Sequence, residues 1–169
     1  MRFLIPLLLF CLTLQLSSCK SGQKIKKETN LLKVDSLENG SKKLYLLKNK
    51  KLELVENNGY LSYTIQDNEK TSVLRYVYAI NQDQVAYDGG YREEILFEIP
   101  NDVIDVKYTD EELKETKMLF GRYCYCRGKN GIFKIRKGKL HVNSSKKEIH
   151  FELDFKIEEV PQVTEQIRY

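Results

Sequence analysis

Residues 148–159 read EIHFELDFKIEE, and this stretch has the most regular alternation of side-chain types in the chain. Apolar residues occupy every second position from Ile149 to Ile157, and charged residues or histidine occupy the positions between them. Successive side chains of a β-strand point to opposite faces of its sheet. The stretch therefore predicts an antiparallel strand with one buried and one solvated face.

Three shorter alternating segments precede this stretch: residues 122–127, 132–136 and 139–143. Turns rich in glycine, lysine and serine separate them. Loops of even length keep the apolar residues of consecutive strands on one face, because side chains alternate with a period of two. We therefore predict that the chain ends in a four-strand meander. In that register Cys124 and Cys126 share the inner face with Phe133 and Ile135.

Alternation also fills most of the chain between residues 43 and 99. The segments concerned are 43–48, 52–56, 60–66, 72–80 and 93–99. Asn49-Lys50 between the first two segments predicts a hairpin, and Asn57-Asn58-Gly59 predicts the turn into the third. The chain holds only 3 prolines and shows no repeat or internal linker. These features predict a single β-rich domain over residues 42–169.

One segment interrupts the strand pattern. Residues 108–120 read YTDEELKETKMLF, with Thr109 as candidate N-cap and Glu112 three positions later, which is the spacing of a capping box. Leu113 and Thr116 form a thin apolar stripe. We predict one short α-helix near residues 110–120. It would lie on a mainly β domain that is folded as an antiparallel sandwich or an open barrel.

The N-terminus has the composition of an export signal. Arg2 is followed by an apolar run from Phe3 to Leu16, and no acidic residue occurs before Glu28. The run is shorter than the roughly 20 apolar residues that a membrane-spanning helix needs. A short basic region followed by such a run predicts a signal peptide over residues 1–18.

Leu16-Ser17-Ser18-Cys19 resembles the lipobox of bacterial lipoproteins, in which an aliphatic residue and two small residues precede a cysteine. The resemblance covers only about the first 20 residues and identifies no family for the rest of the chain. It implies cleavage before Cys19, attachment of diacylglycerol to its sulfur and acylation of the new amine. Such a protein is anchored in the cell envelope by its lipid. Lys20, in place of the aspartate of inner-membrane lipoproteins, favours the outer membrane where the cell has one.

The residues after the lipobox cysteine are basic. Ten lysines and three acidic residues lie in positions 20–51. Lysines close to a membrane surface are attracted to anionic headgroups, although a solvated linker would have the same composition. We predict that residues 19–41 form a lipidated basic tether.

With the signal peptide removed and Cys19 acylated, Cys124 and Cys126 are the thiols that remain. Export to an oxidising compartment favours a disulfide between them. On a regular strand their Cα atoms would lie about 6.6 Å apart, at the upper edge of the disulfide range, so a bond requires a bend. We predict a structural role for the pair, as buried thiols or a local disulfide. A redox couple and a soft-metal site are the alternatives.

The tyrosines beside the cysteines point to the opposite face. Tyr123 and Tyr125 would face Lys134 and Arg136 on the next strand, with Arg122 at the margin. Tyrosine and arginine are enriched in the residues that dominate binding energy, and residues 121–150 carry nine bases against one acid. We therefore predict a candidate partner surface there. A plain solvent-facing sheet would show the same pattern.

The sequence lacks the motifs of the common enzyme classes, such as a nucleophile elbow, a P-loop or a zinc-protease helix. Glu94 and Glu98 alternate with apolar residues, but nothing in the sequence places them in a cleft. Only 2 histidines are present, so we predict no metal site and no cofactor. No nucleic-acid module occurs. The prediction is a non-catalytic binding or structural lipoprotein that engages a protein or envelope partner; the alternative is a lipoprotein that binds a small ligand or metal ion.

Overall fold

The computed structural model describes residues 29–81, 90–102, 105–145 and 148–169. The expected signal peptide, Cys19 and the tether up to residue 28 lie outside these described residues. Within the described part of the chain, no helix is both long enough and apolar enough to cross a membrane.

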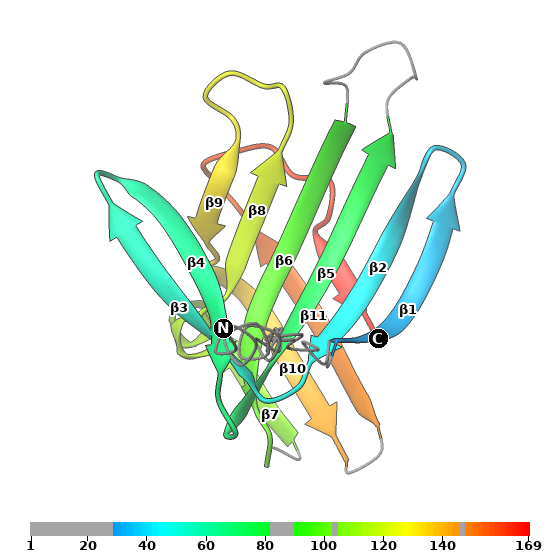
Figure 1. Cartoon of the computed structure of the whole chain (residues 1–169), viewed down its shortest axis with the longest axis vertical. Coiled ribbons are helices and arrows are strands. Elements are labelled where there is room, and N and C mark those ends of the chain that lie inside the picture. Colours follow the sequence, from blue (N-terminus) through cyan, green and yellow to red (C-terminus); the bar gives the residue numbers. More distant parts are fainter. Residues whose placement is uncertain (1–28, 82–89, 103–104, 146–147) are drawn as a thin grey trace, which may run out of the picture.

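Twelve strands form three antiparallel sheets in the described residues (Figure 1). The six-stranded sheet has the order β1 (Thr29–Leu37), β2 (Gly40–Leu47), β5 (Thr71–Asn81), β6 (Gly90–Pro100), β8 (Leu119–Tyr123) and β9 (Gly131–Lys134). The four-stranded sheet has the order β12 (Gln166–Arg168), β11 (Ile149–Lys156), β10 (Lys137–Ser144) and β7 (Asp105–Thr109). The remaining sheet is the hairpin of β3 (Lys50–Asn57) and β4 (Tyr60–Asp67). The predicted mainly β, antiparallel fold is confirmed.

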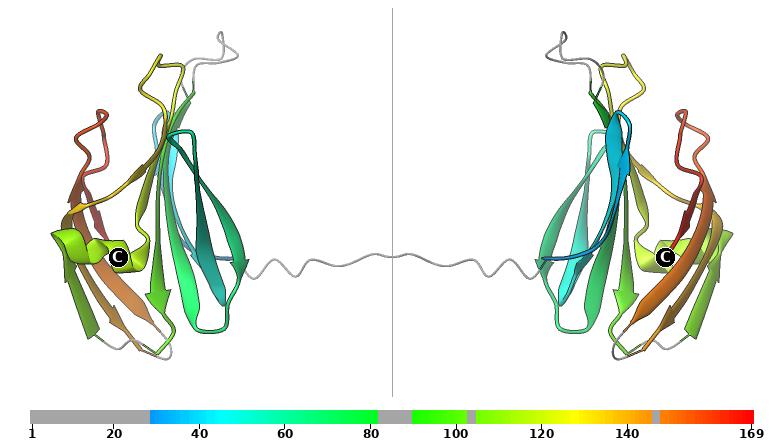
Figure 2. Two further views of the ribbon diagram at one scale, coloured as in Figure 1. Left: turned by 90° about the vertical axis from the view of Figure 1, so that its left-hand side faces the viewer. Right: turned by 90° about the vertical axis from the view of Figure 1, so that its right-hand side faces the viewer.

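The two larger sheets pack face to face as a sandwich, and the hairpin β3–β4 covers the outer side of the six-stranded sheet (Figure 2). Phe97 on β6 and Phe151 on β11 meet edge to face across the core, with ring centroids 5.4 Å apart. Phe120 on β8 and Phe155 on β11 also meet across the core, as a tilted pair with ring centroids 6.0 Å apart. The six-stranded sheet runs from β1 to β9 without closing into a barrel.

The chain ends in a four-stranded antiparallel sheet, but two of its members differ from the expected ones. Strand β11 buries Phe151, Leu153 and Phe155 as its alternation predicts. Strands β8 and β9, however, belong to the six-stranded sheet, and β7 and β12 occupy their expected places. The chain crosses between sheets at Ile135, which is buried and donates its N–H to the Met118 carbonyl at 3.0 Å. Both sheets bury residues in one core. The alternation of apolar residues in the sequence is therefore the same whether β9 and β10 pair in one sheet or lie in two sheets that pack against each other.

The predicted helix is present as a short 3-10 helix, η1 (Asp110–Thr116), instead of an α-helix. The Glu112 carboxylate accepts a hydrogen bond from the Thr109 N–H at 2.9 Å, as the capping box requires. Lys117 takes a left-handed conformation with φ 50° and donates its N–H to the Lys114 carbonyl. This turn ends the helix early, because the residues from Leu119 onward pair with β6.

Two further expectations are corrected near the N-terminus. Residues 29–41, assigned to the tether, form β1 and the start of β2. A bulge between Leu31 and Lys33 interrupts the alternation of β1, which explains why this strand is hard to recognise in the sequence. Asn49 does not close a hairpin either, since β2 pairs with β1 and β5 while β3 pairs with β4.

Candidate functional site

The turns of the six-stranded sheet and its hairpin define two ends of the domain. The β1–β2, β3–β4 and β8–β9 connections lie at one end, at the top of Figure 1. Thr29, where the described chain begins, pairs with Leu47 at the opposite end of β1 and β2. We call the first of these the loop end and the second the entry end.

The β8–β9 connection at the loop end carries the two cysteines. Cys124 and Cys126 form a disulfide, and their Cα atoms are 5.2 Å apart, closer than a regular strand would allow. The predicted placement on a strand facing the core is wrong, because both residues lie in the loop and are partly exposed. Pairing between β8 and β9 ends at Arg122 and Gly131, so the residues between them are free to bend.

Tyr125 is held between the two bonded cysteines and is 90% exposed. Arg127 and Lys129 beside it are also exposed. The backbone turns back between them, with a hydrogen bond from the Lys129 N–H to the Cys126 carbonyl at 3.1 Å. The tip of this loop therefore presents an aromatic ring next to two cationic side chains. At the same end, Tyr60 at the tip of the hairpin is 81% exposed.

Arg122 supports the loop from inside the sandwich and is only 9% exposed. Its guanidinium donates to the Lys129 carbonyl and, through Nε, to the Tyr91 hydroxyl at 3.2 Å. The same group lies over the Tyr91 ring at 5.2 Å from the centroid. Arg122 thus fixes the base of the loop and does not contribute to an exposed surface.

Tyr123 faces the opposite side of the sheet, toward the hairpin. Arg92 on β6 stacks on its ring at 4.2 Å from the centroid, and burial raises the pKa of the Tyr123 hydroxyl. Beside it lies Glu94, which is 2% exposed and pairs with Arg75 at 2.6 Å and Arg92 at 3.4 Å. The Tyr63 hydroxyl from the hairpin donates to Glu94 at 3.4 Å. This buried ion cluster joins β4 to the sheet.

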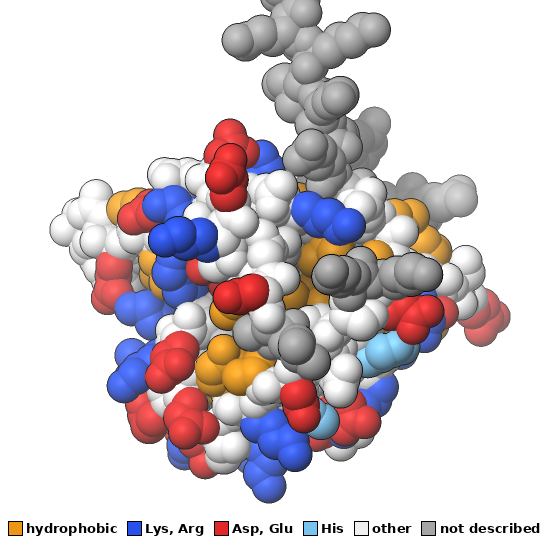
Figure 3. Space-filling view, turned by 90° about the horizontal axis from the view of Figure 1, so that it is seen from below, with side chains coloured by type: hydrophobic (Ala, Val, Ile, Leu, Met, Phe, Trp, Pro, Cys, Tyr) orange, Lys and Arg blue, Asp and Glu red, His pale blue; other side chains and the backbone are white. Residues whose placement is uncertain are grey.

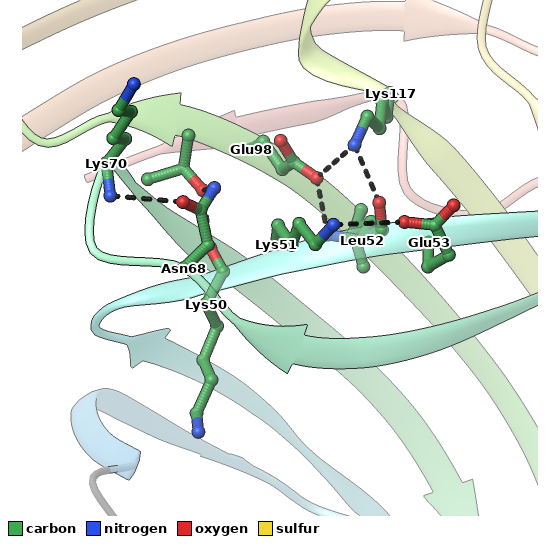
Figure 4. A network of polar contacts seen from close by, with 9 residues as sticks. Lys50, Lys51, Leu52, Glu53, Asn68, Lys70, Glu98 and Lys117 are labelled. Atoms are coloured by element: carbon green, nitrogen blue, oxygen red, sulfur yellow. Dashed lines mark hydrogen bonds and ion pairs between the residues drawn. The ribbon is translucent and has the colours of Figure 1, made fainter.

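A second buried carboxylate fixes the base of the hairpin (Figure 4). Glu98 on β6 accepts hydrogen bonds from the Leu52 N–H and from Lys117 Nζ, the latter at 2.9 Å. Lys117 Nζ also donates to the Leu52 carbonyl at 2.7 Å. Both polar groups of the Leu52 backbone are therefore satisfied, and the hairpin is tied to the residue that follows η1.

Glu93 points into the other side of β6 and is fully buried. It accepts hydrogen bonds from the N–H groups of Val163 at 2.6 Å and Thr164 at 2.8 Å, and from the Tyr91 hydroxyl. Burial and this bond to Glu93 raise the pKa of Tyr91 to about 12. All three carboxylates of β6 therefore hold loops or strands in place, and none forms an open pair of the kind that glycoside hydrolysis uses.

Lys134 and Arg136 lie at the far end of β9 from the disulfide loop. Lys134 Nζ pairs with Glu56 on the hairpin at 2.8 Å. Its hydrogen bond and charge, together with the charge of Arg136, lower the pKa of Glu56. Both cations line a pocket of about 360 Å3. The other lining residues are Leu54, Glu111, Lys114, Lys117, Met118 and Ile135.

The five residues of the predicted partner surface are therefore divided among three places. Tyr125 is exposed at the loop end, Arg122 and Tyr123 are packed against other elements, and Lys134 and Arg136 belong to the pocket. Tyr123 and Lys134 lie on the same face of the sheet, as predicted, but Lys134 pairs with Leu119, and the cation that stacks on Tyr123 is Arg92. Sequence reasoning missed Lys114 and Lys117, because nothing in the local pattern shows that η1 lies beside the end of β9.

A larger hollow of about 920 Å3 opens at the entry end between the two sheets. Figure 3 shows this end from below, with apolar side chains surrounded by charged ones of both signs. Its lining mixes amide, hydroxyl and apolar groups, and includes Leu46, Asn101 and Tyr169. Its charged lining residues, Lys48 and Glu148, are of opposite sign, so the hollow does not favour a ligand of one charge.

The histidines lie on the outer face of the four-stranded sheet. His141 Nε2 is 2.6 Å from the Asp105 carboxylate, and His150 Nε2 is 3.5 Å from Glu148. His141 pairs across the strands with Glu152, so the two imidazoles are not opposite each other. Among the described residues, no three histidine, cysteine or acidic side chains are grouped as metal ligands would be.

Comparison with known proteins found no matching family model, no matching curated protein and no matching solved structure.

Proposed function

We propose that this chain is a lipid-anchored cell-envelope protein that binds a partner protein without catalysing a reaction. The anchor is the acylated Cys19 of the lipobox-like segment. The binding element is the disulfide loop at the loop end of the sandwich. Its aromatic and cationic side chains suit a partner surface that is acidic and has an apolar pocket.

The observation that carries this proposal is the exposure of Tyr125 within the Cys124–Cys126 disulfide. A large aromatic side chain at 90% exposure gains nothing from the core of its own domain. The disulfide restricts the backbone on both sides of the tyrosine, which lowers the entropy lost when a partner orders the loop. The two features together describe a preorganised anchor residue.

The position of the entry end supports the same arrangement. Thr29 follows Cys19 by ten positions, so the anchor lies at most about 35 Å from the start of β1. The loop end is at the other end of the strands (Figure 1). In a membrane-anchored chain the disulfide loop would then face away from the lipid surface, toward partners in the envelope.

The anchor is tested by mass spectrometry of the N-terminal peptide and by cell fractionation. The mature chain should begin at Cys19 and carry the mass of its acyl groups, and it should partition with membranes. The Cys19→Ser variant should lose both the acyl mass and membrane association. A wild-type chain that starts at another residue without lipid would overturn the anchor.

The binding element is tested with a photocrosslinking residue, Tyr125→p-benzoylphenylalanine, in cells. One discrete protein adduct is expected, and it should disappear when Cys124→Ser and Cys126→Ser are added. The matched control places the same residue at Lys139, which is exposed on the outer face of the four-stranded sheet. Equal adducts from both positions, or adducts unaffected by loss of the disulfide, would contradict a specific loop-end partner.

A further inference from the structure

We propose that the pocket between the hairpin, η1 and the end of β9 binds a small organic phosphate monoester, with the phosphate at its cationic rim and the apolar part on its floor. The site is about 360 Å3 in volume. It lies away from the disulfide loop, and the proposal depends neither on the lipid anchor nor on the partner protein. We call it the basic pocket.

The floor of the basic pocket is apolar and rigid. Met118 and Ile135 are each only 2% exposed and join the main core, and Leu54 of the hairpin forms a partly buried wall. The hydrogen bond from the Ile135 N–H to the Met118 carbonyl holds these two residues side by side. The volume is at the small end of the range for ligand sites, which suits a compact molecule better than a long lipid chain.

Four cationic side chains and one carboxylate surround this floor. Two of the cations are held by carboxylates outside the pocket lining: Lys117 by Glu98 at 2.9 Å and Lys134 by Glu56 at 2.8 Å. These contacts fix both ammonium groups at the pocket without using all of their donors, since each ammonium has three. Lys117 has two acceptors in the described structure, Glu98 and the Leu52 carbonyl.

The side chains of the other two cations, Lys114 on η1 and Arg136 after β9, form no hydrogen bond or ion pair with any residue that the structure describes. The charge of Arg136 acts on Glu56 without a direct contact. Each brings a full positive charge to the rim of a pocket whose interior is apolar. A phosphate monoester carries close to two negative charges near neutral pH and offers three acceptor oxygens. The planar guanidinium of Arg136 can donate two parallel bonds to it, and Lys114 can add a point charge.

Glu111 is the one acidic residue in the lining. It lies three positions before Lys114 on the exposed side of η1, where it opposes an incoming anion. Removing the charge of Glu111 should therefore strengthen anion binding, whereas removing the charges of Lys114 and Arg136 should weaken it. The apolar floor adds a second requirement, because a bare inorganic anion cannot use it.

The test is isothermal titration of the full chain as purified from cells, in phosphatidylcholine nanodiscs where it carries lipid. Phenyl phosphate, inorganic phosphate, benzoate and phenol are the four probes. Phenyl phosphate should bind about tenfold or more tightly than inorganic phosphate, which lacks the apolar part, and than benzoate, which has one charge. Phenol should show no binding. Equal affinity for phenyl phosphate and phenol would overturn the assignment to an anion.

The variant Lys114→Gln/Arg136→Gln should weaken phenyl phosphate about tenfold or more, because charged hydrogen bonds are lost. Both residues are exposed and unpaired, so the fold should be retained. The control Lys139→Gln/Lys156→Gln removes the same charge from exposed positions of the four-stranded sheet and should change affinity less than about twofold. An equal loss in both variants would mean non-specific attraction and would reject the site.

Glu111→Gln should strengthen phenyl phosphate binding by about twofold to fivefold at low salt, since it removes a screened like charge. Unchanged or weaker binding in this variant would show that the phosphate is bound elsewhere. The Tyr125 crosslink should be unaffected by all of these changes, so failure of the phosphate site and failure of the partner site can be told apart.

Discussion

The two sides of the six-stranded sheet are built in different ways. The side facing the four-stranded sheet buries a continuous apolar core, in which Phe97, Phe120 and Phe151 are at most 1% exposed. The side facing the hairpin has a much smaller apolar cluster, with Leu52 and Leu96 among its buried members. Polar contacts supplement this cluster: the buried carboxylates of Glu94 and Glu98 each join the hairpin to the sheet, and the Thr71 hydroxyl donates to the Lys50 carbonyl at 2.8 Å. Glu93 is the buried carboxylate of the sandwich side, where it holds the Val163–Thr164 loop. We infer that packing dominates on the sandwich side and that directed polar bonds have a larger share in holding the hairpin.

The largest expected effect is on the sandwich side. Phe97→Ala removes a fully buried ring that contacts Phe151 at 5.4 Å between centroids. It should lower the free energy of unfolding by about 3–5 kcal/mol, because a cavity remains in a packed core. Chemical denaturation followed by circular dichroism measures this loss, and the two sheets of the sandwich should unfold together in one transition.

If the hairpin were as firmly packed as the sandwich, Leu52→Ala would act in the same way. We expect it instead to expose the hairpin to hydrogen exchange while the amides of β10 and β11 stay protected. Uniform loss of protection across all three sheets would contradict the division between the two sides.

Two glycines allow the same chemical change to be compared on each side. A Cβ at Gly138 on β10 would lie 2.2 Å from the backbone oxygen of Asp154, and its φ of 149° disfavours any side chain. A Cβ at Gly121 on β8 would have as its nearest neighbours atoms of the Tyr123 side chain, with the hydroxyl oxygen at 2.8 Å, and a side chain can shift more easily than backbone. Gly138→Ala should cost about 2–4 kcal/mol and Gly121→Ala about 1 kcal/mol.

Thermal unfolding of the two alanine variants measures this difference. We expect the larger fall in Tm for Gly138→Ala, because its new Cβ meets backbone, whereas the Cβ at Gly121 meets a side chain. Equal shifts in Tm would mean that the Tyr123 side chain is as rigid as the backbone of β11. Side chains on the hairpin side would then be no easier to displace than those in the sandwich.

Glu98→Gln tests the polar attachment of the hairpin. The amide keeps the shape and can still accept from the Leu52 N–H, but it loses the charge that holds Lys117. We expect a loss of about 1–3 kcal/mol in hairpin stability, the range for a weakened buried charged hydrogen bond. Hydrogen exchange at the Leu52 amide reports this locally. Glu53→Gln, an exposed neighbour on the hairpin, is the matched control.

The same division explains what could be predicted from the sequence. The strand β11 was predictable because a sheet with one buried face imposes its period on consecutive residues, and Phe151, Leu153 and Phe155 follow it. Glu94 pairs with Arg92, two positions away, but its bond to Arg75 and the bond of Glu98 to Lys117 were not predictable, since each joins residues 19 positions apart in sequence. A charged residue in an alternating strand has the same pattern whether it faces water or a covering hairpin.

The candidate sites follow the same rule. The spacing of Cys124 and Cys126 marks them as a pair, and a disulfide at that spacing requires the bend that the structure contains. The sequence does not show that the chain leaves the sheet after Tyr123, because loops of even length fit both a continued meander and a change of sheet. The basic pocket joins the hairpin, η1 and β9, which meet only when the three sheets are assembled.

The smallest expected effect concerns pH and again separates the two sides. Burial, and secondarily the charge of Glu94, raises the pKa of Tyr63 on the hairpin to about 12. Burial likewise raises the pKa of Tyr76 in the sandwich to about 12. In the unfolded chain these hydroxyls ionise near pH 10. Between about pH 10 and pH 12 the unfolded state therefore loses protons that the folded state keeps, and stability falls as the pH rises.

Replacing each tyrosine by phenylalanine identifies which side of the sheet opens first in alkali. Tyr63→Phe should reduce the alkaline loss of protection at the Leu52 amide, and Tyr76→Phe should reduce the alkaline fall in global stability. Tyr60→Phe, at the exposed hairpin tip, controls for removal of a hydroxyl. Because Tyr63 is only partly buried, its ionisation should release the hairpin from Glu94 before the sandwich unfolds. If both variants changed only the global transition, the hairpin and the sandwich would unfold as one cooperative unit. The different contacts on the two sides of the sheet would then not give the hairpin a lower stability than the sandwich.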